Sequence, residues 1–303
     1  MYSAAVPAVG RGVMGYSSVQ GPDFICVGMP KAGTDWLMDQ VQYHSDFWMP
    51  PVKGLHYLNR GSPGLKNVER RLRQMRKNPG QVRGDRRPGD ERDLHFLTEA
   101  MSLSGRPRDL RAYAALFRFK NGLLSGDITA PYAGAKEDAI SEVNEVIPDV
   151  KIVCLVREPI ARIWSNVSMS YREGRLNGEL LKDPPALMEF IMKAPMYEFA
   201  FASKVANDWA KNAPKVQFRH FLFDDIADRP EKARAEILTY IGADPTKSSG
   251  SLPAGHNRKG RLEKVPFTDE IRKMLVEHFA DEVRECARLF GGQASEWPGR
   301  YGL

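Results

Sequence analysis

One short stretch, 28–34 (GMPKAGT), combines two glycines, a lysine and a hydroxyl. It leaves an apolar run of strand formers, 24–29, and enters a segment with helically spaced apolar residues, 34–43. A strand that turns through glycine into a helix points free backbone N–H groups and the positive end of the helix dipole at one place. Lys31 adds a full charge there. The stretch therefore predicts an anion site, most naturally for a phosphate.

The spacing of this stretch differs from that of a Walker A loop, which has lysine directly after its second glycine and then Ser or Thr. Here Lys31 precedes Gly33, and Thr34 stands where the Walker lysine would be. A magnesium-dependent triphosphatase is therefore disfavoured. Taken alone, the stretch is equally well explained as a turn that contains a lysine by chance.

Two further polar groups accompany the turn. Arg157 directly follows the apolar run 151–156, and Ser165 lies eight residues later on a helix that Pro159 is suited to begin. Residues 258–260 (RKG) form a basic loop. Each group alone has an ordinary explanation, because charged surface residues are usually solvated.

Taken together, these groups resemble the sulfotransferases that use 3'-phosphoadenosine 5'-phosphosulfate (PAPS). Residues 30–37 (PKAGTDWL) are similar to the PKSGTTWL loop that binds the 5'-phosphosulfate, and Arg157 with Ser165 matches the pair that holds the 3'-phosphate. Residues 258–260 match the RKG element that closes over it. The resemblance implies PAPS as donor, 3',5'-phosphoadenosine (PAP) as product, and an EC 2.8.2 type of reaction. The implied cofactor contacts are Lys31, Ala32, Gly33, Thr34, Asp35, Trp36, Arg157, Ser165, Arg258, Lys259 and Gly260.

Two positions of the loop call for comment. Asp35 stands where the family has Thr or Ser, and a carboxylate pointing inward would repel a phosphate, so we expect it to face away. Trp36 matches an aromatic that stacks on adenine in the family, and a core tryptophan at this spacing is nearly as good an explanation.

Sulfuryl transfer, like phosphoryl transfer, is catalysed mainly by positioning and charge stabilisation, with a base for the acceptor proton. We expect Lys31 to act on the bridging oxygen and Lys53 to support the sulfuryl oxygens, with no metal required.

The identity of the base is open. Residues 48–58 resemble the family's KExHYF stretch, in which the Glu after Lys is commonly the base, and this chain has Gly54 at that position. His56 is the first candidate, since the ordinary pKa of histidine, about 6.5, suits the task. Asp127 is the second, because 125–132 resembles the family's GExTPxY element. Otherwise the enzyme is weakened or inactive.

Strands are predicted at 24–29, 123–128, 151–156 and 216–223, and helices at 34–43, 137–147, 160–171, 197–211, 230–241 and 269–289. Their alternation predicts an α/β fold with a central parallel sheet covered on both faces. This agrees with the P-loop-like, nucleotide-kinase-like core that the resemblance implies.

We expect residues 1–22 to be a flexible tail and 23–303 to be one domain. Residues 61–93 carry ten Lys/Arg against five Asp/Glu and form a basic insertion on the acceptor side, helical at 67–77 and loose after Pro79. It is either a solvated loop or a lid for an anionic acceptor.

The chain has 303 residues, a net charge of +6 and three cysteines without a CxxC pair, Cys26, Cys154 and Cys286. We expect these thiols to be buried and reduced, which favours a cytoplasmic location. No apolar run is long enough to span a bilayer. The charge favours anionic partners, and the basic run lacks the interleaved aromatics of a nucleic-acid binder.

Two alternatives to a sulfotransferase stay open: a PAP- or PAPS-binding protein without turnover, and a nucleotide kinase or hydrolase with an atypical P-loop. The acceptor is a hydroxyl or amine of a glycan, a lipid headgroup or a small metabolite. The sequence does not indicate the oligomeric state.

Overall fold

In the part of the chain that the structure describes, four short strands form one parallel sheet in the order β2-β1-β3-β4. β1 and β3 are neighbours, with Gly28 opposite Cys154, so the chain leaves both strands at the same edge of the sheet. The predicted α/β fold with a central parallel sheet is confirmed. The strands are β1 (Phe24–Gly28), β2 (Gly126–Ile128), β3 (Lys151–Val156) and β4 (Gln217–Leu222).

The computed structural model describes residues 21–60, 65–77, 89–247, 250, 252–256 and 265–303. The expected tail therefore lies almost wholly outside the described residues. β1 is entirely buried, and β3 is buried except at Lys151, because helices cover both faces of the sheet. Cys26, Cys154 and Cys286 are buried free thiols, as predicted.

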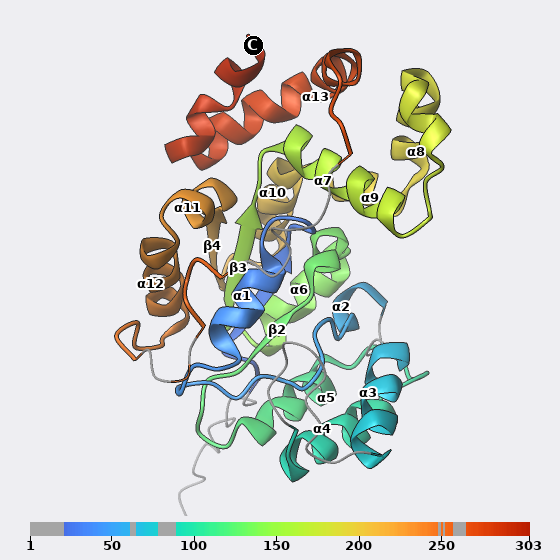
Figure 1. The fold of residues 1–303 in the computed structure, drawn as a ribbon. Helices are drawn as coiled ribbons and strands as arrows, with labels where there is room; N and C mark the ends of the chain where they lie inside the picture. The colour runs from blue at the N-terminus through green and yellow to red at the C-terminus, as the bar shows by residue number, and fades with distance from the viewer. Residues whose placement is uncertain (1–20, 61–64, 78–88, 248–249, 251, 257–264) are drawn as a thin grey trace, which may run out of the picture.

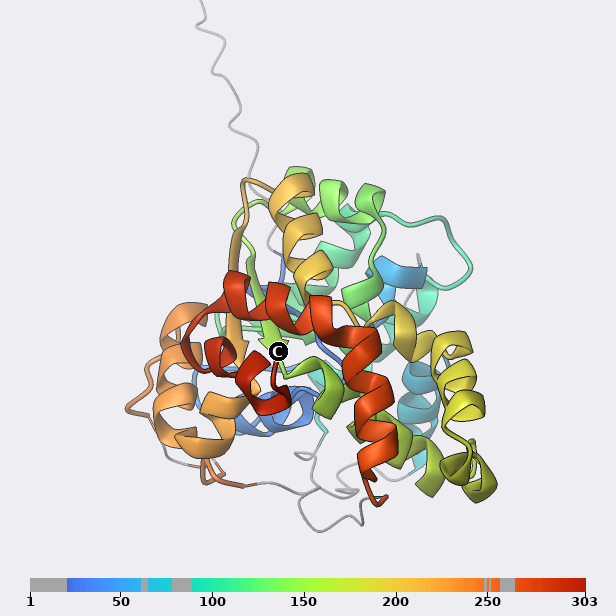
Figure 2. The same ribbon diagram turned by 90° about the horizontal axis from the view of Figure 1, so that it is seen from above.

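Helices surround this sheet, with α11 and α12 beside β4 and α3 to α5 gathered toward β2 (Figure 1). α13 packs against α7, α8 and α10 (Figure 2). The helices of eight or more residues are α1 (Thr34–Val41), α3 (Leu65–Lys77), α4 (Glu91–Ser102), α6 (Glu137–Val146), α7 (Pro159–Arg172), α8 (Pro184–Lys193), α10 (Ala202–Asn212), α12 (Pro230–Ile241) and α13 (Asp269–Phe290).

Shorter elements complete the path of the chain. The short α-helices are α2 (Tyr57–Arg60), α5 (Leu110–Ala115), α9 (Pro195–Glu198) and α11 (Phe223–Asp228). The 3₁₀ turns are η1 (Leu116–Lys120), η2 (Ala130–Gly134), η3 (Gly178–Lys182), η4 (Gly292–Glu296) and η5 (Pro298–Tyr301).

The basic segment contributes to the core as well as to the surface. α3 confirms the predicted helix, and it buries Val68 and Leu72 against the neighbouring helix α4. The expectation of a loose chain up to residue 93 is wrong at its end, because Asp90 and Asp93 form a capping box that starts α4. Residues 78–88 lie outside the described part of the chain.

The predicted helix 197–211 is in fact two helices, α9 and α10, with a break after Glu198. The break lets Tyr197 and Phe201 both pack against the ring of Phe279 on α13, with centroids 6.1 and 6.0 Å away. The chain therefore breaks between α9 and α10 at the place where two aromatic rings pack against α13.

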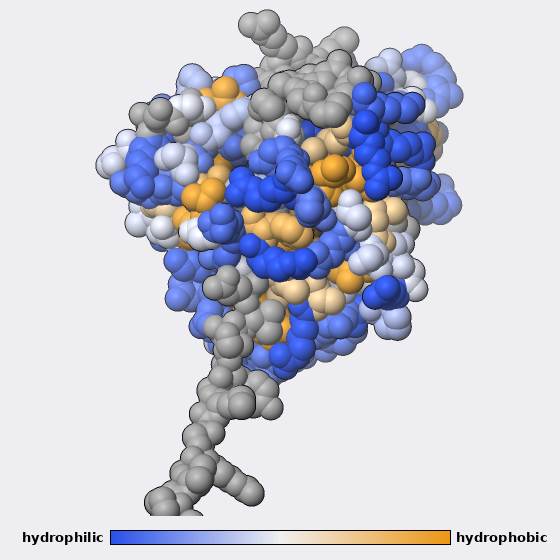
Figure 3. All heavy atoms as spheres, turned by 90° about the horizontal axis from the view of Figure 1, so that it is seen from below, coloured by the Kyte–Doolittle hydropathy of each residue, from blue (hydrophilic) through white to orange (hydrophobic). Residues whose placement is uncertain are grey.

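The face of the molecule seen in Figure 3 is mainly hydrophilic, with apolar areas between the charged side chains. Among the described residues, the exposed large hydrophobic side chains are Tyr171, Met192 and Phe267. Within the same residues, no helix combines the length and apolar character needed to cross a bilayer.

Candidate active site

The turn between β1 and α1 has the geometry that the sequence predicted for an anion site. Lys31 and Gly33 both have left-handed backbones, with φ of 71° and 101°. Gly33 is the N-cap of α1, and no side chain of the described residues caps that helix. A Cβ atom on Gly33 would lie 3.3 Å from the ring of Phe223 and would keep an unfavourable φ. Glycine is therefore required here, and the first N–H groups of α1 suit an anion.

Arg157 directly follows β3 and joins the same turn. Its guanidinium donates to the backbone oxygen of Lys31 at 3.1 Å and lies 4.7 Å from the centroid of the Phe223 ring. Burial lowers the pKa of Arg157. Among the residues that the structure describes, Arg157 has no salt bridge. A half-buried cation of this kind is stabilised by a bound anion.

A cavity of about 760 Å³ opens between this turn, α7, α11 and residues 254–256. Its volume is in the range of small-molecule sites. Some of the predicted cofactor contacts are not among the described residues that line this cavity. Ala32 is fully buried, and residues 258–260 lie outside the described part of the chain. The predicted contacts that do line the cavity are Lys31, Gly33, Thr34, Asp35, Trp36, Arg157 and Ser165.

The cavity also contains residues that the sequence argument did not single out. Trp164 stacks on Phe267 with centroids 4.7 Å apart, which places an aromatic surface beside the cationic turn. Arg172 lies on the same face of α7 as Ser165, two turns further on. The sequence could have predicted that Arg172 lies on the same side of the helix as Ser165. Ala161, Ser165 and Arg172 are spaced by four and seven residues, which are about one and two helical turns.

Asp35 lines the cavity, contrary to what its position in the sequence predicted. We expected its carboxylate to face away from the phosphate site, whereas it lines the cavity and pairs with Lys53 at 2.6 Å. Lys53 also donates to the Thr34 hydroxyl at 3.0 Å. The lysine thus neutralises the carboxylate and ties residue 53 to the first turn of α1.

Asp127 lies at the end of β2 and is only 2% exposed. Its carboxylate accepts hydrogen bonds from the hydroxyls of Thr129 (2.6 Å), Tyr132 (2.6 Å) and Tyr113 (3.0 Å). Burial raises the pKa of Asp127, and the three hydroxyl donors oppose that rise. Asp127 is absent from the described lining of the cavity.

The hydroxyls bound to Asp127 also hold the segment 53–57. The backbone N–H of Leu55 donates to Thr129 Oγ1 at 3.0 Å, and that of Tyr57 donates to the Tyr132 hydroxyl at 2.9 Å. The segment between these two anchors contains His56. Asp127 is therefore placed to orient this segment, and its burial argues against a role as the base.

His56 is half-buried and, like Gly54, has a left-handed backbone, with φ of 58° and 81°. A Cβ atom on Gly54 would lie 3.1 Å from His56 Nε2. The imidazole thus occupies the space into which a side chain at position 54 would extend. Neither His56 nor Lys53 belongs to the described lining of the cavity, although Lys53 contacts two residues that do.

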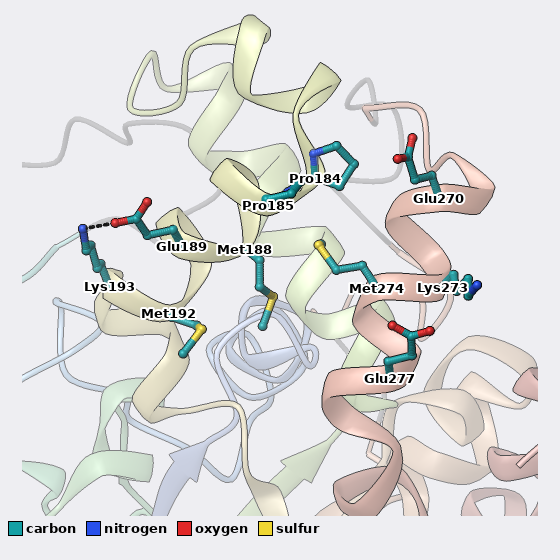
Figure 4. A pocket seen from close by; sticks show the side chains of 10 residues that line it. All are labelled: Pro184, Pro185, Met188, Glu189, Met192, Lys193, Glu270, Lys273, Met274 and Glu277. Atoms are coloured by element: carbon teal, nitrogen blue, oxygen red, sulfur yellow. Dashed lines mark hydrogen bonds and ion pairs between the residues drawn. The ribbon is translucent and has the colours of Figure 1, made fainter.

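A second hollow, of about 890 Å³, lies between α8 and α13 (Figure 4). Met188, Met192 and Met274 form its apolar surface, and Lys193 pairs with Glu189 at its rim. Three glutamates and two lysines line it in all. This hollow does not have the converging cations of an anion site, whereas Lys31 and Arg157 both line the cavity at the turn.

A sequence model described as the Sulfotransferase family matches residues 22–247, which include the turn, Arg157 and Ser165. This chain belongs to the sulfotransferase family. Comparison with curated protein sequences finds no significant match.

A solved sulfotransferase structure has the same fold. The crystal structure of a sulfotransferase from Alicyclobacillus acidocaldarius is similar over 91% of this chain and 98% of that one, with a TM-score of 0.59 and 19% identity. The sulfotransferase domain of the olefin synthase from Synechococcus PCC 7002 is similar over 86% and 96%, with a TM-score of 0.48 and 15% identity. At 19% identity, the likeness to the Alicyclobacillus acidocaldarius structure concerns the fold alone.

Proposed function

We propose that this protein is a PAPS-dependent sulfotransferase that transfers a sulfuryl group to a hydroxyl or amine of an acceptor. The observation that carries the proposal is Arg157, a half-buried guanidinium bonded to the turn at Lys31 and without a salt bridge among the described residues. Two cationic motifs and an aromatic surface thus meet in one cavity of nucleotide size.

The described residues fit a nucleotide with phosphates at both ends of its ribose. The N-terminus of α1 and Lys31 would hold the 5'-phosphosulfate, while Arg157 and Ser165 would hold the 3'-phosphate. Trp36, Trp164 and Phe267 offer aromatic faces for the adenine. When bound, PAPS supplies an activated sulfuryl group whose leaving group is a stable phosphate.

His56 is our proposed base. The acceptor oxygen or nitrogen gains the sulfuryl group and gives its proton to the imidazole, while the bond from sulfur to the bridging oxygen breaks and Lys31 stabilises the charge that develops there. Lys53 would support the sulfuryl oxygens from its position on Thr34. We propose no metal in this reaction.

The acceptor is proposed only by chemical class, as a glycan, a lipid headgroup or a small metabolite. Gly54 favours one alternative, a protein that binds PAP or PAPS with little turnover, because the glutamate common at this position in related enzymes is absent.

The decisive experiment is isothermal titration of PAP into wild type, Arg157→Ala and the control Arg219→Ala. Arg219 is an exposed strand residue outside the described lining of the cavity, and its guanidinium also lies over an aromatic ring. We expect Arg157→Ala to weaken binding at least about 30-fold, since removing one partner of a buried charge pair costs about 2 kcal/mol or more. A wild type that does not bind PAP, or equal binding by Arg157→Ala, would refute the proposal.

A further inference from the structure

Two carboxylates lie close to Arg157 without forming a salt bridge to it. Glu158 is the next residue, and Asp224 follows Phe223, whose ring contacts the guanidinium. Burial lowers the pKa of Arg157, and the charges of Glu158 and Asp224 oppose that effect. Carboxylates so near a half-buried guanidinium would ordinarily pair with it and compete with an anionic ligand.

Glu158 is held by donors other than Arg157. It is the N-cap of α7 and accepts from the backbone N–H groups of Ile160 (2.8 Å) and Ala161 (2.7 Å). The hydroxyl of Tyr301 donates to the same carboxylate at 2.7 Å. The side chain is 2% exposed, so these bonds fix its orientation.

The carboxylate of Asp224 is also held by hydrogen bonds from residues near Tyr301 in the sequence. Its Oδ2 accepts from the indole N–H of Trp297 at 2.9 Å and from the guanidinium of Arg300 at 2.7 Å. Trp297 is fully buried.

The three residues Trp297, Arg300 and Tyr301, which we call the clamp, lie at η4 and η5 after α13. Arg272 of α13 fixes the clamp by donating to the backbone oxygen of Arg300 at 2.7 Å and by lying 5.2 Å from the Tyr301 ring. The family match ends at residue 247, so the clamp is built from chain outside it.

We infer that the clamp positions the 3'-phosphate subsite by holding Glu158 and Asp224 away from Arg157. The guanidinium is then kept for the anion of the ligand rather than for an internal ion pair. Trp297, Arg300 and Tyr301 are positioning residues in this arrangement, because they act through the two carboxylates. The inference rests on the proposed function, which assigns Arg157 to a 3'-phosphate.

The test compares two ligands that differ only in the group that Arg157 would bind: PAP and adenosine 5'-phosphate. Dissociation constants are measured by titration calorimetry for the full chain and for Tyr301→Phe, which removes a single hydroxyl. We expect the preference for PAP to fall about three- to tenfold, the range of one hydrogen bond, with the affinity for adenosine 5'-phosphate unchanged. Arg300→Ala, at an exposed partner of Asp224, should act in the same direction.

Tyr240→Phe is the matched control, since its hydroxyl also donates one short hydrogen bond, here to the backbone oxygen of Gln217 at 2.7 Å, and lies away from Arg157. It should leave the preference unchanged. In the Arg157→Ala background, Tyr301→Phe should cause no further loss, as expected of residues that act through one another.

Different results refute the proposed function and the role of the clamp. A wild type with no preference for PAP over adenosine 5'-phosphate refutes the proposed function. A wild type that prefers PAP together with a Tyr301→Phe variant that keeps the preference, or that loses affinity for both ligands equally, overturns the inference about the clamp.

Discussion

The turn 28–34 follows the end of β1, and the segment 53–57 is anchored to the chain that follows β2, yet different interactions hold these two regions. The turn is shaped by its own backbone, with Gly33 at φ 101° and Arg157 bonded to Lys31 across neighbouring strands. The 53–57 segment is held by side chains from another part of the chain. Its backbone donates to the hydroxyls of Thr129 and Tyr132, and both hydroxyls donate to the buried carboxylate of Asp127.

Because the turn and the 53–57 segment are held differently, we expect them to respond differently to amino-acid substitutions. A turn specified by glycine and strand order can be predicted once its motif is combined with Arg157 at the end of the neighbouring strand, because these features are readable from the sequence. A segment held by a buried polar network tolerates a change such as Gly54 only while the network persists. We therefore expect substitutions on the two sides to separate donor binding from turnover.

The largest expected effect is on turnover, in His56→Ala. Loss of a general base lowers kcat by about 10²–10⁴, while PAP affinity should stay as in wild type because the donor side is untouched. Transfer from labelled PAPS to a panel of hydroxyl and amine acceptors measures kcat, and the acid limb of the pH–rate profile should vanish. His95→Ala, on an exposed histidine of α4, is the control. Unchanged turnover in His56→Ala would remove this residue from the mechanism.

The next effect is on stability and turnover together, in Asp127→Asn. The amide cannot accept all three hydroxyl donors, so we expect a loss of about 1–3 kcal/mol in the free energy of unfolding. kcat should fall with PAP affinity retained, because only the 53–57 segment is released.

The pH dependence of that loss has a definite sign. Because burial raises the pKa of Asp127 in the folded state, its contribution is fully present below the ordinary value of 3.8 and is lost as the pH rises through the raised pKa. The stability deficit of Asp127→Asn, measured by denaturant unfolding, should therefore shrink as the pH increases above 3.8. A deficit that grows over this range, or a loss of PAP affinity equal to the loss of kcat, would contradict the comparison.

The smallest effect is expected from Asp35→Asn, which removes a negative charge from the cavity and the partner of Lys53. PAP should bind about two- to fivefold more tightly, an effect that salt reduces, because a partly exposed charge contributes up to about 1 kcal/mol. Titrations at low and high salt measure it, with Asp138→Asn, on the exposed partner of Arg108, as the control. Weaker binding by Asp35→Asn would show that the carboxylate supports the turn more than it repels the ligand.

The sequence by itself determined the parallel sheet and the closeness of Arg157 to the turn 28–34. The apolar runs placed β1 and β3, and parallel strand ends meet at one edge, so the turn and Arg157 had to be close. The burial of Cys26 and Cys154 followed from the same apolar runs. These features depend on neighbours in sequence or on strand order, which is why they could be predicted.

Only the tertiary structure decided the direction of Asp35, the burial of Asp127 and the bonds that hold Glu158 and Asp224. Each depends on a partner far along the chain: Lys53 for Asp35, Tyr113 and Tyr132 for Asp127, and Tyr301 and Trp297 for the other two carboxylates. A carboxylate in a sequence could act as a catalytic base, repel an anionic ligand or hold a neighbouring segment in place. Which of these it performs is set by the donors that the fold brings to it.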